Sequence, residues 1–176
     1  MMDKIEFSRA VTLEEIGREG LHKDLEASAE ECMALAPRLG LLAISSVSAK
    51  LDIRKSKDGS VVTVTGRLAA KVTQECIVTL EPVEAEVSAE LSERFVRQEE
   101  IEPEAVVEVE DEECYDEIIE GDSIDIGEMV SQCLTLELEP YPRKEGIEFE
   151  LSESDLNPEA VTGPFAELAG LKRNNS

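Results

Sequence analysis

The chain has 176 residues, with 41 Asp and Glu against 17 Lys and Arg, which gives a formal net charge of −24 at pH 7. This charge argues against a protein whose whole surface binds nucleic acid, DNA included, because phosphate binding depends on Lys and Arg. The absence of Trp and the low numbers of Phe and Tyr also argue against a base-stacking platform. No apolar run approaches the ~20 residues that span a bilayer, and the first residues do not resemble a signal peptide, so we expect a cytoplasmic protein with no membrane segment.

The cysteines and the single histidine give no sign of a metal, a cofactor or a catalytic site. Cys32, Cys76, Cys114 and Cys133 contain no C-x-x-C pair, so a structural zinc site is not expected. Buried free thiols are the simpler interpretation. Catalysis of the Ser/His/Asp or Cys/His type would have to use His22, which has no Gly-flanked nucleophile nearby.

Two strands and a helix are expected in the first 40 residues. Residues 5–10 and 21–27 alternate between apolar and polar side chains, which is typical of β-strands. Ser28 and Glu31 form an S-x-x-E capping box, in which each side chain satisfies an unpaired backbone N–H. A short helix over residues 28–39 is therefore predicted.

The clearest pattern is a β-hairpin in the middle of the chain. Odd positions are apolar in residues 46–54, and even positions are apolar in residues 62–72, so each stretch predicts a strand with one buried face. Asp58-Gly59 is a turn signal, and Gly59 can adopt positive φ. Residues 83–96 alternate again, which predicts a three-stranded antiparallel meander. The expected hairpin pairs are Ile53 with Val64, Ala49 with Leu68, and Val47 with Ala70.

The chain becomes strongly acidic after the third strand. Residues 98–122 contain 13 Asp or Glu and no Lys or Arg. Such a block repels itself and is usually a solvated loop, so we expect a mobile acidic loop, with contact to a basic partner as the functional alternative. The candidate contact residues are Glu108, Glu110, Asp111, Glu112 and Glu113.

A second helix is predicted after this loop. A D-x-x-E start at Asp125 and an apolar stripe at helical spacing predict a helix over residues 125–139 that covers the apolar side of the meander. We therefore expect a single α+β domain at residues 1–150. It consists of an antiparallel β-meander, either open or partly closed into a barrel, covered by one or two helices. Residues 151–176 are predicted to form an acidic, flexible C-terminal tail.

One stretch opposes the global charge. Residues 50–71 contain six basic side chains against two acidic ones. The predicted strands place four of the six on the outer face of the sheet, with Lys50 opposite Arg67, and RNA phosphate or an acidic partner would relieve that like-charge pair. Alternatively, glutamates of the third strand or the acidic loop neutralise this face. The candidate contact residues are Lys50, Arg54, Lys55, Lys57, Arg67 and Lys71.

Two segments resemble a known family. Residues 74–83, Gln-Glu-Cys-Ile-Val-Thr-Leu-Glu-Pro-Val, are similar to a strand and turn of the YceD family, the large ribosomal RNA subunit accumulation proteins. Residues 120–128, followed by Tyr141-Pro142-Arg143, resemble a second motif of that family. The early Phe7-Ser8-Arg9 and residues 164–173 look like its alphaproteobacterial members.

The resemblance implies a bacterial cytoplasmic protein that is needed for normal accumulation of large-subunit ribosomal RNA, and it implies no enzymatic activity. Many members carry C-x-x-C at the position of Cys76, whereas here Thr79 stands in place of the second cysteine. Any metal role in those members is therefore not carried over to this chain.

These features together predict a non-enzymatic factor in large ribosomal subunit biogenesis that binds a basic ribosomal protein or ribosomal RNA. The net charge favours the protein partner, because repulsion from RNA would have to be overcome locally. One alternative is an adaptor or regulatory interaction protein that docks through its acidic surface or through residues 164–173. Another is a carboxylate-dependent hydrolase, which would need Asp and Glu side chains that converge in a pocket. The sequence does not indicate an oligomeric state.

Overall fold

The centre of the fold is the meander that the alternation in the sequence predicts. The computed structural model describes residues 5–97, 117–119 and 121–146. In it β3 (Ala43–Lys55), β4 (Val61–Glu75) and β5 (Pro82–Arg97) form consecutive antiparallel pairs. The turn between β3 and β4 closes at Gly59, whose φ of +79° lies in the left-handed region that glycine adopts readily. The predicted register is confirmed, with Ile53 opposite Val64, Ala49 opposite Leu68, Val47 opposite Ala70 and Lys50 opposite Arg67.

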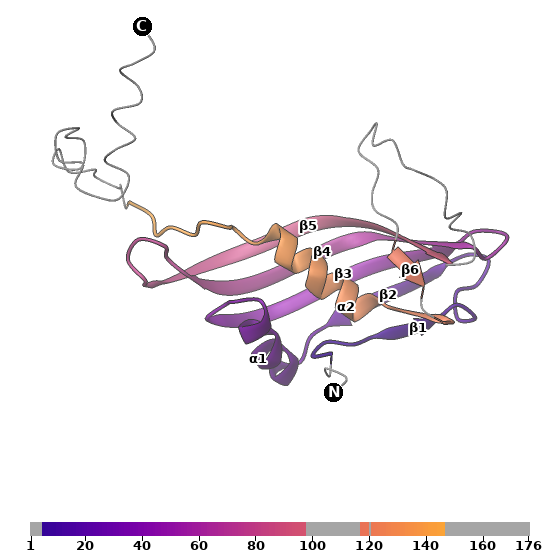
Figure 1. The fold of residues 1–176 in the computed structure, drawn as a ribbon, viewed down its shortest axis with the longest axis horizontal. Coiled ribbons are helices and arrows are strands. Elements are labelled where there is room, and N and C mark those ends of the chain that lie inside the picture. Colours follow the sequence, from indigo (N-terminus) through magenta and orange to yellow (C-terminus); the bar gives the residue numbers. More distant parts are fainter. Residues whose placement is uncertain (1–4, 98–116, 120, 147–176) are drawn as a thin grey trace, which may run out of the picture. The chain divides into compact units, whose positions relative to one another are not determined.

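Two further strands extend the meander into a five-stranded sheet (Figure 1). β2 (Leu21–Glu26), which the alternation of residues 21–27 predicts, pairs antiparallel with β3. β6 (Glu117–Ile119) pairs in parallel with the end of β5. The strand order is β2-β3-β4-β5-β6, and among the described residues the two end strands do not meet, so the sheet is open.

Part of the acidic segment forms the strand β6. Residues 98–122 were expected to be one loop, yet Glu117–Ile119 form a strand within it. A parallel partner so far along the chain carries no local signal, because only the fold brings the two strands together. Residues 98–116 lie outside the described part of the chain, and with them the candidate contacts from Glu108 to Glu113. The same holds for residues 151–176, the predicted tail.

Helix α1 (Ala29–Arg38) forms where the capping box predicts it. The backbone N–H of Glu31 donates to Ser28 Oγ at 3.2 Å, and the N–H of Ser28 donates to Glu31 Oε2 at 2.8 Å. The two side chains thus satisfy backbone donors that the helix itself leaves unpaired. Pro37 lies in the last turn, and the helix ends one residue later.

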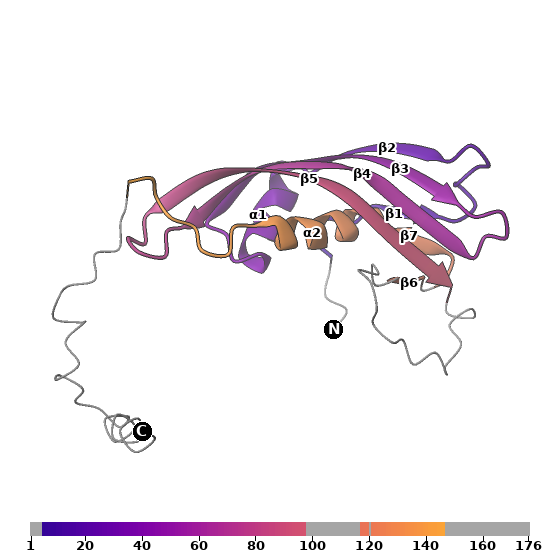
Figure 2. The same ribbon diagram turned by 90° about the horizontal axis from the view of Figure 1, so that it is seen from above.

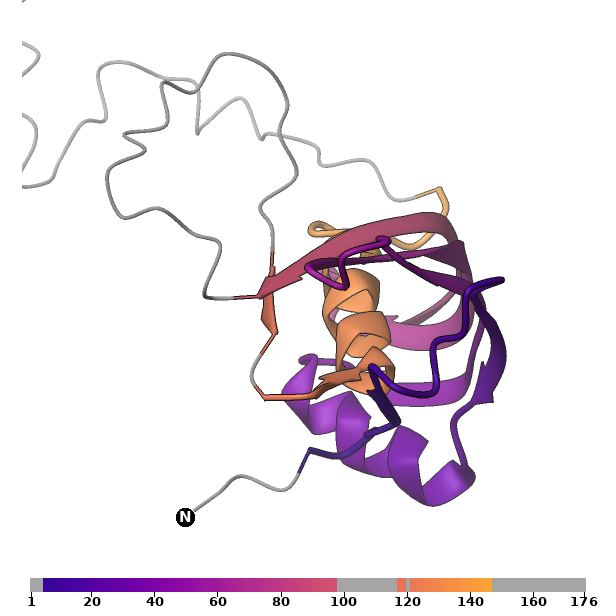
Figure 3. The same cartoon turned by 90° about the vertical axis from the view of Figure 1, so that its right-hand side faces the viewer.

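Helix α2 (Ile126–Glu137) lies in the hollow of the curved sheet (Figures 2 and 3). Asp125 is its N-cap, because the backbone N–H groups of Gly127 and Glu128 donate to Asp125 Oδ1 at 3.0 and 3.1 Å. The helix buries its apolar stripe against the sheet, as predicted. The buried residues of the stripe are Ile126, Met129, Val130, Cys133 and Leu134.

The prediction of a strand over residues 5–10 is wrong for most of its length. The strand β1 covers Ala10–Thr12 and pairs antiparallel with β7 (Ser123–Asp125), which comes just before α2. The residues before β1 instead lie against α2, where Phe7 is fully buried. A Cβ atom added at Gly127 would lie 2.5 Å from the carbonyl oxygen of Phe7, so only glycine allows this close approach.

Candidate interaction surface

Four of the predicted basic residues do lie together on the outer face of the sheet, the face of β2 to β5 that points away from the helices. Lys50 and Arg54 of β3 and Arg67 and Lys71 of β4 are all exposed, and they alternate with buried neighbours along each strand. We call these four residues the basic band. Its place confirms the face that the alternation predicts.

Acidic side chains on the neighbouring strands flank the basic band, and two of its four residues form ion pairs with them. Arg67 Nη2 lies 2.9 Å from Glu90 Oε1, and Lys71 Nζ lies 2.7 Å from Glu86 Oε1. On the other side, Asp24 of β2 is opposite Lys50 in the register. The hydrogen bond from Lys71 lowers the pKa of the Glu86 carboxyl, and the same contact raises the pKa of Lys71. The basic band therefore lies between two acidic strands rather than forming an open cationic surface.

The other two predicted basic residues are not part of this band. Lys55 has the same strand parity as Ile53, so it points to the inner side, where its Nζ donates to the carbonyl oxygen of Leu13 at 2.5 Å. The alternation of odd and even residues in the sequence already predicts this inward position of Lys55. Lys57 lies in the turn between β3 and β4, beyond the end of the strand.

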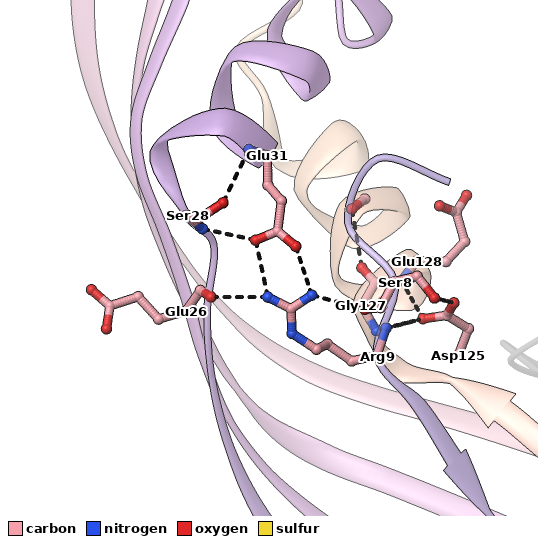
Figure 4. A network of polar contacts seen from close by, with 9 residues as sticks. Ser8, Arg9, Glu26, Ser28, Glu31, Asp125, Gly127 and Glu128 are labelled. Carbon is pink, nitrogen blue, oxygen red and sulfur yellow. Dashed lines mark hydrogen bonds and ion pairs between the residues drawn. The ribbon is translucent and has the colours of Figure 1, made fainter. Parts of the chain in front are cut away.

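A polar network holds the N-terminal segment to both helices (Figure 4). The guanidinium of Arg9 donates to both carboxylate oxygens of Glu31, at 2.7 and 2.9 Å, and its Nη2 also donates to the carbonyl oxygen of Glu26 at 3.3 Å. The hydrogen bond from Arg9, together with the cap contact from Ser28, lowers the pKa of Glu31 to about 2. Bidentate pairing of this kind fixes geometry as well as charge.

Asp125 lies at the other end of the same network. Its Oδ1 accepts a hydrogen bond from the backbone N–H of Arg9 at 2.8 Å, and its Oδ2 accepts one from Ser8 Oγ at 2.5 Å. Burial alone would raise the pKa of Asp125, but the hydrogen bonds from Ser8, Arg9 and the first turn of α2 lower it. These contacts stabilise the fold, because they connect the N-terminal segment to the first turn of α2.

Cys76 lies in the turn between β4 and β5, directly after the last residue of β4. Its side chain has no exposed surface, and Sγ accepts a hydrogen bond from the N–H of Thr79 at 3.5 Å. Hydrogen bonds from Thr79, and from the backbone of Lys144 and Val78, lower the pKa of the Cys76 thiol to about 6. Because the sulfur is fully covered, it serves as an internal acceptor of the turn. Cys32 and Cys133 are also buried free thiols, as predicted.

One cavity in the described residues bears on the hydrolase alternative, because Glu14, Asp58 and Asp122 are among the residues that line it. This cavity of about 690 Å³ lies at one end of the sheet, where Arg97 Nη2 lies 3.5 Å from Asp122 Oδ1, and Asp58 accepts hydrogen bonds from Ser56 and Ser60. In residues 5–97, 117–119 and 121–146 no group of three or more His, Cys, Asp or Glu side chains is arranged to hold a metal ion. The same part of the chain contains no helix long and apolar enough to cross a membrane.

Comparison with models of known protein families gives a match. The family model described as "Large ribosomal RNA subunit accumulation protein YceD" matches residues 64–172, which is more than half of the chain. The match includes most of β4 and all of β5, the acidic segment and α2. Neither the curated proteins nor the solved structures contain a match to this chain.

Proposed function

The chain belongs to the YceD family of large ribosomal RNA subunit accumulation proteins, and on this premise we propose that it is a non-enzymatic factor that holds a basic ribosomal protein during assembly of the large subunit. The family name implies a role in accumulation of large-subunit ribosomal RNA. A protein can serve that role without touching RNA, by keeping a cationic subunit component soluble and available until it is incorporated. The proposed site of action is the cytoplasm.

The observation that carries this proposal is the pairing of half of the basic band with glutamates of β5, in a chain of net charge −24. Binding of an RNA backbone releases counterions in proportion to the number of Lys and Arg that contact phosphate. Here Arg67 and Lys71 already contact Glu90 and Glu86, and those glutamates would repel a phosphate that approached the band. A cationic polypeptide meets the opposite field, which attracts it over the length of the surface.

The two band residues without an ion pair in the described part of the chain, Lys50 and Arg54, provide the test. We would reverse both charges in the double variant Lys50→Glu, Arg54→Glu. The control is Arg18→Glu, Arg143→Glu, which makes the same change in net charge at exposed positions away from the band. Binding would be measured by co-purification with isolated large-subunit ribosomal proteins and, separately, with large-subunit ribosomal RNA.

We expect the wild-type chain to retain basic ribosomal proteins at low salt and to lose them as salt rises, because exposed charges are screened. Both double variants should bind these proteins at least as well as the wild type. Tight RNA binding by the wild type that the Lys50 and Arg54 reversal abolishes, and the control reversal leaves intact, would overturn the proposal in favour of RNA contact.

A further inference from the structure

The two edges of β5 differ in what they pair with. One edge pairs with β4 along the whole strand. The other pairs with β6 only over Phe95–Arg97, and between residues 83 and 93 no backbone hydrogen bond from the described residues reaches it. In Figure 2, β5 runs along the near side of the sheet, with β6 beside its C-terminal end. Eleven consecutive residues of a sixteen-residue strand thus present an open edge within the described part of the fold.

The register identifies which backbone groups face this edge. The N–H of Arg97 donates to the carbonyl oxygen of Ser60, so the pair formed by these two residues is hydrogen-bonded. In an antiparallel ladder such pairs alternate with pairs that turn their backbone groups outward. The odd residues of β5 therefore bond with β4, and the even residues direct their N–H and C=O groups to the open edge. The even residues between 83 and 93 are Glu84, Glu86, Ser88, Glu90 and Ser92.

The side chains along the edge have two distinct characters. Glu84, Glu86 and Glu90 are exposed on the outer face. On the inner face the odd residues from Val83 to Ala89 are apolar and half-buried, and Ala85 and Val87 pack against the core. A strand added here would place one row of its side chains beside three carboxylates and the other row beside an apolar surface that is only partly covered.

We propose that the open edge of β5 binds an extended, basic segment of a partner protein as an additional strand, in which Lys or Arg alternates with apolar residues. This inference rests on the proposed function and names the surface that holds the basic partner. Strand addition supplies affinity through backbone hydrogen bonds, and the alternating side chains supply specificity. Opposite charges on neighbouring strands stabilise the pairing, whereas like charges directly opposite each other oppose it.

The charge on β5 also argues against a second copy of this chain as the occupant. Antiparallel pairing of two β5 edges about Ser88 would place Glu86 opposite Glu90 in both halves of the interface. Such like-charge pairs are destabilising. A cationic strand converts the same positions into attractive pairs.

The edge of β2, on the opposite side of the sheet, is the natural comparison. It is only six residues long, and its inner-face row contains the charged Lys23 between Leu21 and Leu25. The carbonyl oxygen of Glu26 already accepts a hydrogen bond from Arg9. This edge therefore offers neither the length nor the apolar row of the β5 edge.

A proline at Ser88 would block the β5 edge selectively. Its N–H faces the open edge, so Ser88→Pro removes a donor for an added strand without removing a hydrogen bond to β4. His22→Pro makes the matched change at an even residue of β2, whose N–H also faces away from its partner β3. Circular dichroism would establish that both variants keep the fold.

The probe is a fluorescein-labelled peptide, Lys-Val-Lys-Val-Lys-Val-Lys, titrated with the full chain at low salt and followed by fluorescence anisotropy. The control peptide, Lys-Pro-Lys-Pro-Lys-Pro-Lys, has the same charge but cannot donate from its prolines to a ladder. We expect the Val peptide to bind more tightly than the Pro peptide. Binding of the Val peptide should weaken at least tenfold in Ser88→Pro and remain unchanged in His22→Pro.

A second variant keeps the proposal testable if Ser88→Pro does not fold. The triple variant Glu84→Gln, Glu86→Gln, Glu90→Gln should weaken binding about tenfold, since it removes all three opposite-charge pairs between β5 and the peptide. Glu14→Gln, Glu19→Gln, Glu30→Gln is the control with the same change in net charge at exposed positions. If both triple variants bind the Val peptide equally well, the open edge of β5 is not its binding site.

The outcomes separate this proposal from the proposed function. If both peptides bind equally well, and Ser88→Pro binds them like the wild type, the edge proposal is wrong while a basic partner is still held elsewhere on the acidic surface. If neither basic peptide binds but large-subunit RNA does, the edge proposal and the proposed function are both overturned.

Discussion

Two sets of ion pairs in this molecule use the same chemical groups in opposite surroundings. Arg9 and Glu31 meet where the N-terminal segment reaches α1, with side chains 35% and 21% exposed. Arg67 and Glu90 meet on the outer face of the sheet, with side chains 69% and 82% exposed. The inner pair forms two hydrogen bonds, while the outer pair forms one at 2.9 Å. The comparison indicates that the network of Arg9, Glu31 and Asp125, which we call the inner network, stabilises the fold. The outer pairs remain available to a partner at little cost to stability.

The largest expected effect comes from the centre of the inner network. Asp125→Ala removes the N-cap of α2 and leaves the N–H of Arg9 without its acceptor. We expect the free energy of unfolding, measured by urea denaturation at pH 7, to fall by about 3 kcal/mol. Asp52→Ala, an exposed aspartate of β3, is the control and should change stability by less than about 0.5 kcal/mol. If both variants lost a similar amount of stability, the conclusion that the inner network stabilises the fold more than exposed charges do would be contradicted.

The next effect depends on pH and concerns Glu31. Its pKa in the folded state, about 2, lies below the ordinary value for glutamate of 4.5, because Arg9 and Ser28 hydrogen-bond to the charged form. The stabilisation that follows is complete above the ordinary pKa and is lost as the pH falls through that value towards 2. Urea denaturation should therefore show Glu31→Gln well below the wild type at pH 7, with the gap much smaller at pH 3. A gap of the same size at both pH values would show that Glu31 acts through packing rather than charge.

The smallest expected effect belongs to the outer pair. A double-mutant cycle with Arg67→Gln and Glu90→Gln should give a coupling free energy below about 0.5 kcal/mol, because both groups are well solvated. Thermal or urea denaturation of the four proteins provides the measurement. A coupling above about 1 kcal/mol would mean that the outer face is itself a rigid part of the fold, and it would weaken the case for a surface open to a partner.

The parts of the fold that sequence alone predicted are those with local causes. The register of Ile53 with Val64 follows from the two-residue period and from a turn that closes at Gly59, all within a short stretch of chain. The start of α1 follows from the Ser28 and Glu31 box, and the buried face of α2 from its apolar stripe. Each of these patterns is fixed by residues close to one another in sequence.

The missed features depend on contacts between distant segments. Ala10 pairs with Asp125, and Phe95 pairs with Glu117. No local pattern in the sequence predicts which strand pairs with which in these two cases. Among the candidate site residues, the outer positions of Lys50, Arg54, Arg67 and Lys71 were predictable from strand parity. Lys55 was named as a candidate contact although the same parity places it on the inner side. The neutralisation of the basic band was an open alternative, because the rotamers that bring Glu86 and Glu90 onto it cannot be read from alternation alone.

The central claim, that this acidic chain holds a basic ribosomal protein directly, is best tested by purifying the tagged full-length protein from its own cells. The purification would be done at low and at moderate salt, with and without ribonuclease, and both protein and RNA would be identified. We predict that large-subunit ribosomal proteins are recovered at low salt, persist after ribonuclease treatment and are released at moderate salt. Recovery of large-subunit RNA, with loss of every ribosomal protein once ribonuclease is added, would contradict the account.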